Sequence, residues 1–165
     1  LYNKGYLMEA LDAEFKRARA LHTPLTVLFF DLDFFKKVND TFGHDAGDFV
    51  LREFSNLVKN KHLRPKDVFA RYGGEEFAII LPETTLEAAR EVAEKCRQAV
   101  QDLGIEHAAN ANFGVVTISI GVACVVPEDA LHYGDLIEMA DQALYESKER
   151  GRNCVSLYRT KSSSR

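Results

Sequence analysis

The chain has 165 residues, with 21 Lys and Arg against 25 Asp and Glu, which gives a formal net charge of −4. This length fits one domain, and the 46% of hydrophobic residues can form a substantial core, which excludes a disordered tail. The slight acidic excess argues against a dedicated nucleic-acid binder. The longest apolar run, residues 25–30, is far shorter than the ~20 residues of a membrane helix.

Helical and strand patterns alternate from the first residues onward. Apolar residues at steps of three and four predict a helix over residues 5–21. The apolar run over 25–30 predicts a buried strand, which ends in Asp31-Leu32-Asp33. A second helix is expected over residues 45–59, with Asp45 as its N-cap.

The middle of the chain has the pattern of a hairpin followed by a helix. Two strand-like runs, 68–71 and 77–81, flank Gly73-Gly74, and a tight turn there would use the freedom of glycine at positive φ. Thr84, with Glu87 three residues later, predicts a capping box at the start of a helix whose apolar positions continue to residue 103.

The last third predicts a strand, a helix and a short closing strand. Apolar residues alternate over 116–122, as in a strand, and Asp135 with Glu138 is typical of a helix start. That helix should end near Gly151, before a strand over 154–158. We expect one domain over residues 1–160 and an unstructured tail over 161–165.

The core order of these elements is β-α-β-β-α-β. This pattern predicts an α+β fold of the ferredoxin-like type, in which helices cover one face of a mostly antiparallel sheet. The first helix, the last helix and the final strand are additions to this core. In this topology the first strand and the hairpin are central neighbours in the sheet.

Carboxylates interrupt the apolar pattern at two places, Asp31 and Asp33 after the first strand and Glu75-Glu76 in the hairpin turn. The predicted topology brings these places to one edge of the sheet, where a divalent cation would relieve their repulsion. Ligands that are all oxygen indicate Mg²⁺, whose remaining positions are taken by water and substrate phosphates. Adjacent residues of an extended chain face opposite ways, so Glu75 and Glu76 cannot both reach one ion. A solvated acidic turn is the alternative.

The segment after the first strand suits a nucleotide. The backbone N–H groups of Phe34-Phe35-Lys36-Lys37 and the Lys36 ammonium could bind a triphosphate, although a surface lysine pair is the plainer explanation. Asn39 and Asp48 could recognise a guanine edge, with His44 beside them, but they could equally belong to a turn and a solvated helix.

A basic cluster near the end of the chain and an Arg–Asp pair before the hairpin both have ordinary structural explanations. Lys148, Arg150 and Arg152 lie where the last helix is expected to end, and the helix dipole alone favours cations there. Arg64 and Asp67 could form a local ion pair.

Three dispersed cysteines and the absence of a signal-peptide pattern are typical of a reduced, cytoplasmic domain. No nucleophile constellation of the Ser-His-Asp or Cys-His kind is visible.

Residues 31–48 and 71–77 resemble the two signatures of GGDEF domains, the bacterial diguanylate cyclases, and residues 118–123 and 140–153 match later segments of that family. The resemblance extends to about residue 158. It implies a palm-like fold similar to nucleotidyl cyclases, and condensation of two GTP into cyclic di-GMP with release of pyrophosphate. Glu75 replaces the motif aspartate, which is the GGEEF variant and keeps the carboxylate. The chain starts inside the family's opening motif, so we expect an N-terminally trimmed domain.

The resemblance also implies roles for individual residues. Mg²⁺, with Mn²⁺ as a substitute, would bind Asp31, the Leu32 carbonyl and Glu75, while Glu75, Glu76 and Lys36 would be catalytic. The residues implied in binding GTP are Phe34, Phe35, Lys36, Asn39, His44, Asp48, Gly73, Gly74, Lys148 and Arg152.

Arg64 and Asp67 match the spacing of the family's inhibitory product site, which implies product inhibition. Because each domain binds one GTP, catalysis would require a homodimer of facing domains. The alternative is a non-catalytic GGDEF-like module that senses GTP or cyclic di-GMP. Neither nucleic acid nor direct membrane contact is expected for this cytoplasmic domain, whether or not its parent protein is membrane-anchored.

Overall fold

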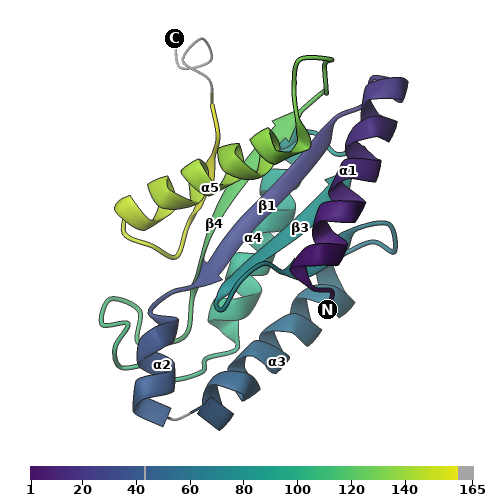
Figure 1. The fold of residues 1–165 in the computed structure, drawn as a ribbon. Coiled ribbons are helices and arrows are strands. Elements are labelled where there is room, and N and C mark those ends of the chain that lie inside the picture. Colours follow the sequence, from purple (N-terminus) through teal and green to yellow (C-terminus); the bar gives the residue numbers. More distant parts are fainter. Residues whose placement is uncertain (43, 160–165) are drawn as a thin grey trace.

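The computed structural model describes residues 1–42 and 44–159, without the side chains of residues 38, 39, 41–47 and 61. Its described part contains one five-stranded sheet of order β2-β3-β1-β4-β5 (Figure 1). The strands are β1 (Leu25–Leu32), β2 (Val68–Arg71), β3 (Glu76–Pro82), β4 (Ile118–Val125) and β5 (Val155–Leu157). Strand β1 is antiparallel to both β3 and β4, as β2 is to β3, whereas β4 and β5 are parallel. The predicted β-α-β-β-α-β order is confirmed, and β1 and β3 are neighbours at the centre of the sheet, whereas β2, the other hairpin strand, lies at the edge.

Helices flank both faces of this sheet (Figure 1). The two helices of the predicted core share one face, as expected, and the two additional helices cover the other. The helices are α1 (Lys4–Leu21), α2 (Phe35–Phe42), α3 (His44–His62), α4 (Leu86–Asp102) and α5 (Tyr133–Glu149). Helices α3 and α4 pack on one face, and α1 and α5 pack on the other. The reason lies in β1, where all eight residues are buried and successive side chains must find apolar partners on opposite sides.

The face under α3 contains a cluster of phenylalanines. The rings of Phe30, Phe54, Phe69 and Phe77 lie with centroids 5.2 to 6.0 Å apart. Edge-to-face contacts of this kind add to the free energy gained by burying apolar surface. The cluster joins α3 to β1, β2 and β3, so the end of β1 rests on a rigid base.

Helix α5 lies directly against β4 at Gly121. A Cβ there would come within 2.2 Å of both the Ala140 carbonyl oxygen and the Leu144 nitrogen, so only glycine fits. The Ser147 hydroxyl also donates to the Ile120 carbonyl at 2.7 Å. This close approach brings the last turn of α5 beside the end of β1.

Several local expectations were wrong. The N-cap of α4 is Thr85, whose hydroxyl accepts from the Ala88 N–H, and not Thr84, which bonds to tertiary partners instead. Helix α5 begins before Asp135, because His132 forms a capping box with it. Helix α2 was not expected at all. The predicted N-cap Asp45 lies outside the described side chains, and α3 begins at His44.

Candidate active site at the end of strand β1

Asp31 lies in the middle strand of the sheet, opposite Glu76 of β3 and Ser119 of β4. Its side chain is only 4% exposed. One carboxylate oxygen, Oδ2, lies 2.5 Å from the Lys148 ammonium of α5. The other oxygen, Oδ1, is buried and has no hydrogen-bond partner among the described residues. A buried charged oxygen without a partner is costly, so Asp31 is a candidate ligand site.

Burial raises the pKa of Asp31 to about 6, since the charged carboxylate loses its hydration. Lys148 opposes this increase, while the nearby Asp33 and Glu75 carboxylates reinforce it. The influence of Glu75 means that the hairpin turn lies within electrostatic range of Asp31. The end of β1 and the hairpin therefore come together, as the predicted topology required.

The donors at this edge fit a magnesium ion. They are oxygen atoms, and Mg²⁺ is commonly held by one or two carboxylates with water and phosphate oxygens completing its coordination. The described residues contain no group of three or more His, Cys, Asp or Glu side chains suited to a metal. Asp31 and Glu75, two carboxylates at this edge, would be the candidate protein ligands. Leu32, the third expected ligand, is buried and offers only its backbone carbonyl.

Asp33 has a role that the sequence did not reveal. This fully buried carboxylate accepts hydrogen bonds from the Thr117 hydroxyl at 2.7 Å, the Ser119 hydroxyl at 2.6 Å and the Asn153 N–H at 3.1 Å. Its backbone N–H also donates to the Thr117 carbonyl. Asp33 therefore fixes the end of β1 to β4 and to the turn after α5. The sequence signal that could have revealed this role is the pair of hydroxyl residues, Thr117 and Ser119, which alternate with apolar residues and so share one face of the strand.

The turn between β1 and α2 places Phe34 in the left-handed region, with φ of 58°. The Phe34 carbonyl accepts from the Lys37 N–H at 3.0 Å and lies 3.3 Å from Nε2 of the buried His107. The Arg152 guanidinium lies 4.6 Å from the Phe34 ring centroid. Phe35, which is buried, begins α2, so the amides expected to bind phosphate lie at a helix N-terminus. No spacing in the sequence pointed to His107.

The Gly73-Gly74 turn does not use positive φ, contrary to expectation. A Cβ on Gly74 would meet nothing within 4 Å, so the absent side chain leaves open space rather than relieving strain. Nε of Arg71 donates to the carbonyls of Gly73 at 3.2 Å and Gly74 at 3.1 Å, and holds the turn together. Arg71 was missed because a charged residue beside a hairpin is unremarkable in sequence.

Four other residues were expected to bind GTP, and the described part of the structure shows no contact that fixes their side chains in the site. Lys36 and Asp48 are exposed, with their side chains toward solvent. Asn39 and His44 lie outside the described side chains, so their expected contact with guanine is not described.

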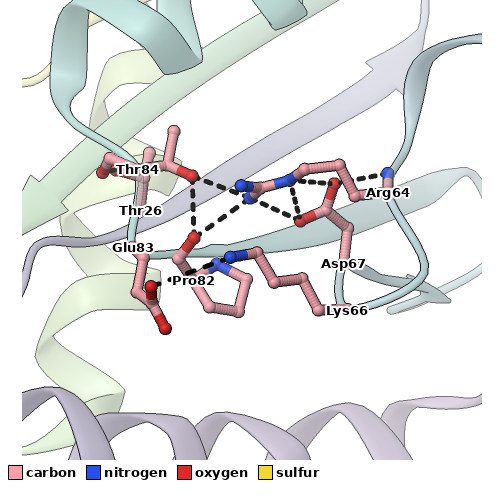
Figure 2. Close-up of polar contacts among 7 residues, drawn as sticks. All are labelled: Thr26, Arg64, Lys66, Asp67, Pro82, Glu83 and Thr84. Atoms are coloured by element: carbon pink, nitrogen blue, oxygen red, sulfur yellow. Dashed lines mark hydrogen bonds and ion pairs between the residues drawn. The ribbon is translucent and has the colours of Figure 1, made fainter.

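Arg64 and Asp67 form a closed cluster at the opposite end of β3 (Figure 2). Arg64 Nε lies 3.1 Å from both Asp67 oxygens, and NH2 lies 2.7 Å from Oδ1. The same NH2 donates to the Pro82 carbonyl at 3.0 Å and the Thr84 hydroxyl at 2.8 Å. The Asp67 side chain is 2% exposed. The local ion pair considered from the sequence is therefore present.

Fold and site together define a mixed α+β domain with metal-compatible carboxylates at the edge of a palm-like sheet. The family model "Diguanylate cyclase, GGDEF domain" matches residues 1–154. The chain belongs to this GGDEF family of diguanylate cyclases.

Relatives and solved structures agree with this assignment. The chain is 43% identical to the probable diguanylate cyclase DgcT of Escherichia coli over 94% of its own length, but spans only 33% of that protein. It resembles the active GGEEF domain of a Vibrio cholerae diguanylate cyclase, with a TM-score of 0.87, 34% identity and coverage of 97% and 99% of the two chains. The GGDEF domain of DgcB from Caulobacter crescentus, in complex with c-di-GMP, gives a TM-score of 0.86, 32% identity and coverage of 97% and 90%.

Among residues 1–42 and 44–159, no helix combines the length and apolarity needed to span a bilayer.

Proposed function

We propose that this domain is a diguanylate cyclase, which condenses two GTP into cyclic di-GMP and releases pyrophosphate. The observation that carries the proposal is the buried Oδ1 of Asp31, which has no hydrogen-bond partner among the described residues and lies at the sheet edge within electrostatic range of Glu75. The 3′-hydroxyl oxygen of one GTP forms a bond to the α-phosphorus of the other. The bond from that phosphorus to pyrophosphate breaks, and the same exchange then closes the ring.

Asp31, the Leu32 carbonyl and Glu75 would hold Mg²⁺, for which Mn²⁺ could substitute. The ion supplies Lewis-acid chemistry and a template for the phosphates. Glu75 or Glu76 takes the proton of the attacking hydroxyl. Lys148, which now neutralises Asp31, becomes available to a phosphate once Asp31 has another cation.

The chain's remaining site residues bind and orient GTP. The Phe34 and Phe35 amides lie at the start of α2, where N–H groups suit phosphate oxygens. The open space beside Gly74, in the Gly73-Gly74 turn, admits the nucleotide. The full set of proposed GTP-binding residues also includes Lys36, Asn39, His44, Asp48, Lys148 and Arg152. Lys36 additionally stabilises charge in the transition state.

Two domains must face each other, because each holds one GTP and both new bonds cross between them. We therefore expect a homodimer during catalysis and a rate per domain that falls on dilution. Product inhibition would act through Arg64 and Asp67, and the complex of the similar DgcB domain with c-di-GMP supports cyclic di-GMP as a ligand. The domain would work in the cytoplasm, without contact to nucleic acid or the membrane.

The test is to incubate concentrated protein with GTP and Mg²⁺ and to analyse the products by chromatography. Cyclic di-GMP should form with the wild type, and product should be lost with Glu75→Gln. Glu87→Gln, which changes an exposed helix carboxylate, is the matched control and should retain activity. Binding of GTP without any product would identify a sensing module and refute the cyclase.

A further inference from the structure

The turn that follows α5 has an unusual backbone. Gly151, Arg152 and Asn153 all lie at positive φ, with values of 111°, 66° and 47°. Glycine adopts this region freely and asparagine does so more readily than most residues, but an arginine with its Cβ does not. Such a conformation persists only where surrounding contacts maintain it. The turn must therefore be held from outside.

Asn153 provides these contacts. Its Oδ1 accepts from Arg97 NH1 at 2.9 Å, and its Nδ2 donates to Gln101 Oε1 at 3.1 Å. Its backbone N–H donates to Asp33 Oδ2 at 3.1 Å and to the Ser119 hydroxyl at 3.2 Å. One residue thus connects α4, on one face of the sheet, with the end of β1.

Arg97 is well placed to hold Asn153. Its side chain is only 12% exposed, and NH1 also donates to Gln101 Oε1 at 3.0 Å. Glu94 and Gln98 accept from the other guanidinium nitrogens. A guanidinium bonded on several sides is fixed in orientation, so its bond to Asn153 is directional.

Arg152, which precedes Asn153 in this turn, points toward the start of α2. Its guanidinium lies 4.6 Å from the Phe34 ring centroid, and its NH1 lies 3.7 Å from Asp33 Oδ1. This position is next to the start of α2. Rotation of the neighbouring Asn153 out of its left-handed conformation would turn the Arg152 side chain away.

We propose that Arg97 and Asn153 are positioning residues, which hold Arg152 in the orientation needed to bind the phosphates of GTP. The inference rests on the proposed function, since it assumes that Arg152 meets phosphate. Neither Arg97 nor Asn153 touches the nucleotide. Without them the turn relaxes, and the site loses an oriented cation while its carboxylates remain in place.

The experiment measures binding of 3′-deoxy-GTP with Mg²⁺ by calorimetry, because this analogue lacks the attacking hydroxyl and is not turned over. We expect Arg97→Met and Asn153→Ala to weaken its binding by about tenfold, the effect of losing roughly one oriented charged contact. Asn153→Asp keeps the acceptor for Arg97 and tolerates positive φ, so it should restore affinity to within about threefold. Arg90→Met, which changes an exposed arginine of α4, is the matched control.

A second ligand distinguishes a loss of Arg152 orientation from a general loss of structure in the binding site. Binding of 3′-deoxy-GMP, which lacks the β- and γ-phosphates, should fall by a smaller factor than that of 3′-deoxy-GTP. Melting curves establish that each variant is folded, and Asn153→Gly replaces Asn153→Ala if the latter unfolds. Wild-type affinity in folded Arg97→Met and Asn153 variants, or equal losses for both ligands, overturns the inference. Failure of the wild type to bind 3′-deoxy-GTP overturns the proposed function instead.

Discussion

Two buried aspartates, at opposite ends of the β1–β3 strand pair, are each paired with a basic residue, yet their surroundings differ. Both oxygens of Asp67 accept hydrogen bonds from Arg64, whose guanidinium also reaches Pro82 and Thr84. Asp31 has one oxygen on Lys148, and its other oxygen finds no partner among the described residues. The strands between them span about 20 Å, at roughly 3.3 Å per residue.

The difference separates a carboxylate that supports the fold from one that, in the proposed function, is held ready for a ligand. A buried carboxylate whose oxygens are all hydrogen-bonded recovers most of the free energy that it loses with its hydration, whereas one with an unpaired oxygen destabilises the protein. Proteins tolerate such violations mainly at functional sites. Removing the charge should therefore have opposite effects on stability at the two aspartates.

The largest effect is expected from Asp31→Asn. Loss of this ligand should lower the rate of cyclic di-GMP synthesis by at least about 100-fold, because the metal would lose one of two carboxylates. The free energy of unfolding without metal should rise, by on the order of 2 kcal/mol at pH 7, since the raised pKa of Asp31 reports an unfavourable buried charge. Denaturant titration in EDTA measures this. Lower stability of the variant would contradict the comparison.

The same variant has a predictable pH dependence. The folded-state pKa of Asp31, about 6, exceeds its ordinary value of 3.8, so the buried charge destabilises the wild type above pH 6. As the pH falls below 6, folded Asp31 takes up a proton while the unfolded chain stays ionised, so this destabilisation decreases steadily and is lost below about pH 3.8. The stability difference between wild type and Asp31→Asn should shrink from pH 7 to pH 5 in EDTA.

Asp67→Asn should have the opposite sign. It weakens a buried carboxylate's bonds to Arg64, so we expect unfolding free energy to fall by about 1 to 2 kcal/mol. Synthesis of cyclic di-GMP should continue while inhibition by added product weakens. Asp129→Asn, which alters an exposed aspartate, serves as the control in the same denaturation series. A variant more stable than the wild type would remove the distinction between the two sites.

The smallest effect is expected from Thr84→Val. The buried Thr84 hydroxyl accepts from Arg64 NH2 and donates to the Pro82 carbonyl at 2.8 Å (Figure 2). Losing it should reduce unfolding free energy by about 1 kcal/mol, because Arg64 keeps its other partners. Thr84→Ser, which retains the hydroxyl, should remain close to wild type in thermal melts. Wild-type stability of Thr84→Val would contradict the prediction, because valine keeps the methyl group and lacks only the hydroxyl.

Sequence patterns predicted the strand order and the meeting of Asp31 with the hairpin, because these follow from local periodicity and from the few topologies that it allows. The same patterns misplaced the α4 cap. Thr84 and Thr85 are adjacent hydroxyls, and the choice between them depends on Arg64, a residue distant in sequence. They predicted the additional helices α1 and α5 but not the face of the sheet that these helices cover, since an apolar strand does not show what packs on each face.

The amino-acid sequence by itself determined the family and the order of the core elements. Only the tertiary structure decided which oxygen of Asp31 lacks a partner, that Asp33 joins β1 to β4, and that Arg97 holds Asn153. The physical reason is distance along the chain. Local periodicity governs neighbours within a turn or a strand, whereas these hydrogen bonds join residues 56 to 84 positions apart.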